Sequence, residues 1–210
     1  TGVGIDVFAA LTDGDNNSVL GFGPGTSFTT AHSNVGIGSG AMSSIDTGHD
    51  NVALGYNALN DGTTARNNVC IGTEAGGSLT IYQAEHNIAI GIQALATLTD
   101  RSDNIAIGYR SLGMNDAAVI SQCTAVGALT FSDTGFGGYG NTAFGYRAGV
   151  AQTGGLHNTL VGRASGVNIT TGSNNCHLGY NTQNSSAGTS EIVIGQGATG
   201  KGNTTGFIHP

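Results

Sequence analysis

Charged residues are scarce in this sequence, and tryptophan is absent. Only 9% of the 210 residues are charged, against about 25% in an average protein. The six lysines and arginines are spread along the chain, so no cationic cluster is available to neutralise nucleic-acid phosphates. No apolar run approaches the roughly 18 residues of a membrane-spanning helix. We therefore expect no nucleic-acid partner and no membrane insertion.

Proline and cysteine are also rare. There are two prolines, and the 37 glycines follow no Gly-X-Y triplet, which excludes a collagen-like chain. The three cysteines are an odd number without a Cys-x-x-Cys pair, which argues against a disulfide framework. Cys70 and Cys176 lie in strand-like runs, where we expect buried free thiols. Low charge with moderate hydrophobicity indicates a folded, turn-rich β protein rather than a disordered tail.

A five-residue motif recurs along nearly the whole chain: Asn, a β-branched residue, a small residue, a large aliphatic residue and Gly. Clear copies are Asn51 to Gly55, Asn68 to Gly72, Asn87 to Gly91, Asn104 to Gly108 and Asn141 to Gly145. The motif glycines of all eleven copies are Gly21, Gly38, Gly55, Gly72, Gly91, Gly108, Gly127, Gly145, Gly162, Gly179 and Gly195. Six of the ten spacings are 17 residues, and the others are 16 to 19. Such regularity indicates a repeat architecture.

Within each copy the apolar residues alternate with period two, which predicts a short β-strand. Asn before the strand suits a left-handed turn, or a ladder of amides between stacked copies. The motif Gly suits a positive φ or a close approach of backbones. The third residue after it is always small, which predicts a second short strand or a bend. The remaining polar residues read as the turn that returns the chain.

The repeat predicts an all-β fold, a parallel β-solenoid (a β-roll or β-helix) of about eleven coils of ~17 residues. Residues 1–16 are a lead-in or a degenerate first coil, 17–203 the repeat domain and 204–210 a C-terminal tail.

The two bulky positions of each strand are expected to face the core, and the small residue between them the opposite side. That small residue is Ala53, Ala89, Ala106, Ala125 or Ala143 in five copies. A solvated sheet face normally carries charge, so we expect this alanine column to be covered by sister chains around a symmetry axis. Another segment of the same chain is the alternative. Ala106→Glu should then block assembly.

The stretches from Asn51 to Ala58 (Asn-Val-Ala-Leu-Gly-Tyr-Asn-Ala) and from Asn141 to Ala148 resemble the head repeats of trimeric autotransporter adhesins. They also resemble repeats of bacteriophage tail fibres. The resemblance covers about residues 17 to 200 and implies an intertwined or side-by-side homotrimer with a structural and host-recognition role. It places the chain on a virion surface or, alternatively, on a bacterial surface. The coils are longer than the usual adhesin repeat, and no heptad stalk or membrane anchor is visible, so we expect a middle or distal piece of a fibre.

No catalytic or nucleotide-binding motif occurs, so we predict no enzyme and no cofactor. A polysaccharide-degrading tailspike is the remaining enzymatic alternative, because such enzymes use pairs of carboxylates. His177 lies in the alanine column, where we expect a buried or capped histidine and predict no metal site. The alternative is that three copies meeting at an axis hold an ion or water there.

Aromatic residues on the longer coils are our candidates for contact with a host cell-surface glycan or protein. They are Phe131, Phe136, Tyr139 and Tyr82. The alternative is that they complete a local core or a seam between subunits. The tyrosines that follow the motif glycine are interpreted as a structural stack; they are Tyr56, Tyr109, Tyr146 and Tyr180.

Overall fold

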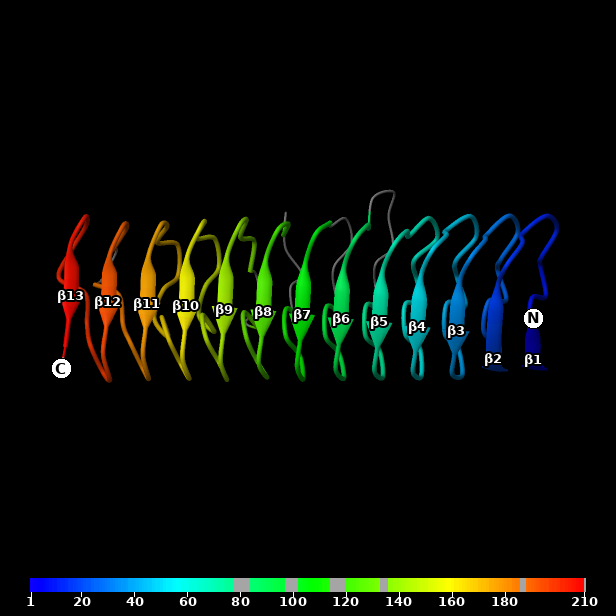
Figure 1. The fold of residues 1–210 in the computed structure, drawn as a ribbon, viewed down its shortest axis with the longest axis horizontal. Helices are drawn as coiled ribbons and strands as arrows, with labels where there is room; N and C mark the ends of the chain where they lie inside the picture. The colour runs from blue at the N-terminus through cyan, green and yellow to red at the C-terminus, as the bar shows by residue number, and fades with distance from the viewer. Residues whose placement is uncertain (78–83, 97–101, 114–119, 133–135, 186–187, 210) are drawn as a thin grey trace. The chain divides into compact units, whose positions relative to one another are not determined.

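The protein is an all-β parallel solenoid, as the repeat predicts. The computed structural model describes residues 1–77, 84–96, 102–113, 120–132, 136–185 and 188–209, and it contains thirteen strands and, in these ranges, no helix. The chain forms two compact units, residues 1–104 and 105–210. Each coil contributes one labelled strand and returns through turns (Figure 1).

Unit 1 contains β1 to β6, which pair in parallel in the order of the chain. Equivalent motif residues stand opposite one another, as in the pairing of Val35 with Val52 and of Ala53 with Cys70. The first strand lies within the predicted lead-in, and its Gly4 pairs with Gly21. The strands are β1 (Gly2–Ile5), β2 (Ser18–Phe22), β3 (Val35–Ile37), β4 (Val52–Leu54), β5 (Val69–Ile71) and β6 (Ile88–Ile90).

Unit 2 repeats this plan with β7 to β13, again in parallel and in chain order. The variable spacing of the motif is absorbed in the turns, because the strands stay in motif register, as in the pairing of Ala125 with Ala143. The strands are β7 (Ile105–Ile107), β8 (Thr124–Val126), β9 (Thr142–Phe144), β10 (Thr159–Val161), β11 (Cys176–Leu178), β12 (Ile192–Ile194) and β13 (Gly206–Ile208). β13 lies in the segment that we assigned to the tail.

The strands face the opposite way from our prediction. In β4 the central Ala53 is fully buried, whereas Val52 and Leu54 are 38% and 43% exposed. The same alternation holds from β2 to β12. The alanine column, including Ala106, therefore lines the interior of its own coil and is not covered by sister chains.

Large apolar side chains from the turns fill the interior opposite the alanine column. Met42, Leu59, Leu95, Leu112 and Phe131 each follow a motif glycine by four residues, and each is fully buried. The small residues three positions after the glycine are buried as well, and nine of the eleven lie in turns rather than in a second strand. Small residues on the strand thus face large residues on the turns, and the two sets fill a narrow coil.

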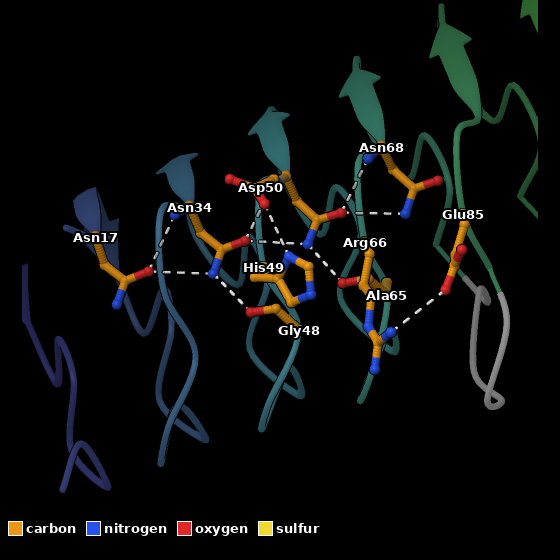
Figure 2. A network of polar contacts seen from close by, with 10 residues as sticks. Asn17, Asn34, Gly48, His49, Asp50, Ala65, Arg66, Asn68 and Glu85 are labelled. Atoms are coloured by element: carbon orange, nitrogen blue, oxygen red, sulfur yellow. Dashed lines mark hydrogen bonds and ion pairs between the residues drawn. The ribbon is translucent and has the colours of Figure 1, made fainter. Parts of the chain in front are cut away.

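A ladder of buried asparagine amides runs along unit 1 (Figure 2). The Oδ1 atom of Asn51 accepts hydrogen bonds from the backbone N–H and the Nδ2 of Asn68, each at 3.1 Å. Its Nδ2 donates to Asn34 Oδ1 at 3.0 Å and to the carbonyl oxygen of Ala65 at 2.7 Å. The amide-ladder prediction for Asn is correct. The left-handed turn belongs instead to the preceding residue, for example Asp50 with φ of 57°.

In unit 2 the ladder has different residues at its ends. Asn141, Asn158 and Asn175 bond as in unit 1. Cys123 occupies an Asn position, and its thiol donates to the carbonyl of Gly138 at 3.3 Å, replacing the amide donor. At the other end Glu191 accepts hydrogen bonds from the backbone N–H groups of Ser185 and Gly202.

The motif glycine is required because consecutive coils approach closely at that point. Gly55 has φ of 141°, and a β-carbon built on it would lie 2.5 Å from the carbonyl oxygen of Gly72 in the next coil. No other residue combines this backbone conformation with so short an approach. The absence of a side chain in the glycine column therefore permits the close stacking of consecutive coils.

Candidate association and recognition surface

The outward side of the strands in unit 1 carries two columns of large apolar residues. They lie three positions and one position before the motif glycine, and we call them the outward columns. Leu20, Val35, Ile37, Val52 and Leu54 are each more than a third exposed. Monomeric proteins rarely expose a continuous apolar patch of more than a few hundred Å², so this surface is unusual for a chain that functions alone.

The outward columns of unit 2 mix large apolar residues with threonine and one cysteine. Phe144, Leu178 and Ile192 are 43%, 48% and 49% exposed, and Thr142 and Thr159 stand in the same columns. None of the outward-column positions from β2 to β12, in either unit, carries a charge. Sheet faces and edges that meet water normally include charged side chains.

Several charged side chains of unit 1 lie in two separate columns, five and six residues before the motif glycine (Figure 2). Here His49 contacts the Asp50 carboxylate at 2.8 Å, and Arg66 pairs with Glu85 at 3.6 Å. The rings of His32 and His49 stack with their centroids 4.6 Å apart. Exposed pairs of this kind contribute little to stability, but they show that polar residues are sorted away from the outward columns.

The outward side of unit 1 is also hollowed. A depression of about 220 Å³ over β1 to β3 is lined by Thr1, Val3, Ser18, Val19, Leu20, Val35 and Ile37. Its walls are mainly aliphatic, so it fits an apolar side chain better than a polar ligand. Concave apolar surface next to bulky apolar columns is the geometry of an interface between protein surfaces.

His177 does not face an axis between copies, which removes the alternative of an axial ion there. The ring is fully buried inside its own coil, with Nδ1 at 3.1 Å from Thr182 Oγ1 and Nε2 at 3.2 Å from Asn184 Oδ1. Burial lowers the pKa of His177 below its ordinary value of 6.5, although the Asn184 hydrogen bond and the charge of Glu191 act in the other direction. A neutral histidine with both nitrogens engaged is the buried, capped histidine that we expected from the sequence.

Only part of the predicted receptor-contact set is exposed. Phe131 and Phe136 are fully buried and stack on each other with centroids 4.7 Å apart, so they form local core. Tyr139 is 38% exposed and meets the ring of His157 edge-on. Tyr82 lies outside the described residues. The first three therefore do not form one exposed cluster.

The three cysteines differ in environment. Cys70 is buried in the alanine column, where burial raises the pKa of its thiol to about 12. Burial raises the pKa of Cys123 to about 11. Cys176 was expected to be buried, but it stands in an outward column and is exposed. The reversal of the strand faces explains the difference, because Cys70 takes the central position of its strand and Cys176 an outer one.

The described part of the chain contains no group of three or more His, Cys, Asp or Glu side chains placed to hold a metal ion. In the same residues there is no helix of the length and hydropathy that a bilayer crossing requires. No protein-family model, curated protein or solved structure matches the chain.

The sequence-based prediction assigned the outward columns to the core and so missed them as a surface. A signal was present in the sequence. Large apolar residues recur four positions after the motif glycine, as in Met42, Leu59 and Leu95. A narrow coil has room for only one bulky column inside, so these residues require that the bulky strand residues point out.

Proposed function

We propose that this chain is a structural and host-recognition segment of a homotrimeric surface fibre, carried on a virion in the manner of a phage tail fibre. The observation that carries the proposal is the uncharged, exposed pair of outward columns in both units. Burying a large aliphatic side chain contributes about 1.5–3 kcal/mol. Repetition of such residues on every coil therefore gives a strong drive to associate.

A second copy of the chain is the partner that fits best. A repeat array presents the same residues at every coil, so copies aligned in parallel around an axis match column to column. The number three rests on the resemblance of the Asn-x-Ala-x-Gly-Tyr repeats to tail fibres and trimeric adhesin heads. A bacterial adhesin head would use the same interface, and domains flanking this segment would distinguish the two settings.

The test is a charged substitution in the outward columns. Val52→Lys combined with Leu54→Lys should leave the coil folded, because neither side chain enters the interior. It should reduce the particle mass from three chains to one, because three-fold packing would bury unpaired ammonium groups. Mass is measured by light scattering, and folding by circular dichroism.

Thr47→Lys is the matched control, because Thr47 lies on an exposed turn away from the outward columns. This variant adds the same type of charge and should keep the mass of the unmodified protein. An unchanged mass for the Val52 and Leu54 double variant would refute association through the outward columns.

A further inference from the structure

A third column follows the strands at the residue directly after the motif glycine. In unit 2 it includes Tyr109, Tyr146, Arg163 and Tyr180, and we call these four residues the tyrosine–arginine column. The three tyrosine side chains are 46%, 42% and 44% exposed. The column lies past the ends of β7, β9, β10 and β11, at the margin of the outward columns.

The centre of this column is a stack of a cation between two aromatic rings. The guanidinium carbon of Arg163 lies 5.6 Å from the ring centroid of Tyr146 and 5.2 Å from that of Tyr180. The three residues belong to consecutive paired coils, β9 to β11, so they recur at the ~4.8 Å spacing of neighbouring strands. Such stacking orients the guanidinium while its N–H edge stays available.

The charge around the column favours an anion. No acidic residue occurs between Asp133 and Glu191, whereas Arg147 and Arg163 both lie in that stretch. Glu191 is buried and bonded to backbone N–H groups. None of the ion pairs among the described residues involves Arg163. The exposed surface of these coils is therefore cationic in a chain of net charge −7.

The two units differ sharply in charge. Unit 1 has ten acidic and two basic residues, a net charge of −8, and unit 2 has three acidic and four basic residues, a net charge of +1. The negative charge of unit 1 would repel an acidic ligand, whereas the small positive charge of unit 2 would not. The contrast also provides an internal control, because Tyr56 occupies the same column in unit 1 between Ser39 and Thr73.

We infer that the tyrosine–arginine column binds an acidic polysaccharide of the uronic-acid type. The apolar face of a pyranose ring packs on exposed tyrosine rings. The tyrosine hydroxyls form hydrogen bonds with the sugar hydroxyls. The carboxylate accepts paired N–H donors from the stacked guanidinium of Arg163. A periodic ligand suits a column that offers one side chain per coil.

This inference deepens the recognition part of the proposed function and rests on it. A neighbouring copy would cover the outward columns, whereas residues at the rim of an interface stay accessible to solvent. The column therefore remains open to a glycan in the assembled fibre.

The experiment measures binding of oligogalacturonate, and of the same oligosaccharide with its carboxylates methyl-esterified, by isothermal titration calorimetry. The acid form should bind at least about ten-fold more tightly than the ester, a difference that one charge-assisted pair can supply. Arg163→Gln should abolish this preference. Tyr146→Ala and Tyr180→Ala should each weaken binding of the acid form about ten-fold.

Tyr56→Ala is the matched control and should leave binding unchanged. Equal affinity for acid and ester, no binding of either, or an equal loss in the Tyr56 variant would each overturn the inference. Light scattering on the same samples separates the two proposals. An unmodified protein that is trimeric but does not bind the acid form counts against the glycan site alone, and a monomeric unmodified protein counts against the fibre interface.

Discussion

The asparagine of the motif acts through its side chain, which joins three coils at once. Asn51 bonds to Asn34 in the preceding coil and to Asn68 in the following one, with its Nδ2 donating and its Oδ1 accepting. The amide is fully buried, where an unpartnered polar group costs about 1–3 kcal/mol. A ladder of this kind stabilises the correct register of the coils, because a coil shifted by one residue would leave several buried amides without hydrogen-bond partners.

Asn51→Ala should lower the free energy of unfolding by about 2–4 kcal/mol, because it leaves the buried backbone N–H of Asn68 without its acceptor and removes the hydrogen bonds to Asn34 Oδ1 and to the Ala65 carbonyl. Urea unfolding followed by circular dichroism measures the effect. Ser39→Ala, at an exposed position of the neighbouring coil, should change the value by no more than about 0.5 kcal/mol. Equal effects of the two substitutions would show that the ladder does not stabilise the fold.

His177 makes the stability of the protein depend on pH. Burial lowers its pKa in the folded protein below 6.5, so the unfolded chain takes up the proton first as the pH falls. Stability is therefore complete above the unfolded pKa and decreases as the pH falls toward the folded value. The melting temperature should drop between about pH 7.5 and about pH 5.5.

In His177→Ala this drop should be smaller, and the other five histidines remain as an internal reference. Differential scanning calorimetry of both proteins across this range gives the comparison. Parallel pH profiles for the two proteins would contradict the buried, neutral state of His177.

At the scale of the strand, period-two alternation reveals a strand but does not say which face is buried. The repeat length, the parallel register, the amide ladder and the role of glycine followed from the sequence because each depends on local chemistry or on spacing. The direction of the faces depends on the volume enclosed by the whole coil. Leu59 and Phe131 on the turns fill that volume, so only alanine fits opposite them.

The exposed residues of the candidate surface could not be predicted from the sequence, because their exposure also depends on how the whole coil packs. Phe131 and Phe136 have the composition of an exposed aromatic loop, yet they are buried and stacked. Tyr146 and Tyr180 were interpreted as a structural stack, but the structure shows them exposed with Arg163 between them. That cation comes from the coil between the two tyrosines, so its position depends on the stacking of the coils.

Two adjacent residues of β7 test the reversed faces. Ala106 is buried, and Ile105 is half-buried on the outward side. Ala106→Glu should destroy the folded coil, because it places an unpaired carboxylate in the interior. Ile105→Glu should keep the fold and weaken association. Folding of both variants is measured by circular dichroism, and their association by light scattering. A folded Ala106→Glu variant that fails to assemble, together with an unfolded Ile105→Glu variant, would support the original assignment of the faces.

At the scale of the whole molecule, residues are sorted into columns with separate roles. The asparagine ladder joins successive coils, the alanine column lies in the interior, and the glycine column permits the close approach of neighbouring coils. Charged residues concentrate in the turns of unit 1, and the outward columns carry none. A single chain would leave these apolar columns in water, which is the strongest physical argument for assembly.

The most direct test is the mass of the unmodified protein at micromolar concentration, measured by light scattering. The account predicts a particle of three times the 20.9 kDa mass of one chain, stable on dilution and in high salt, because the interface is apolar. A particle with the mass of a single chain under these conditions would contradict the proposal that the outward columns are an interface.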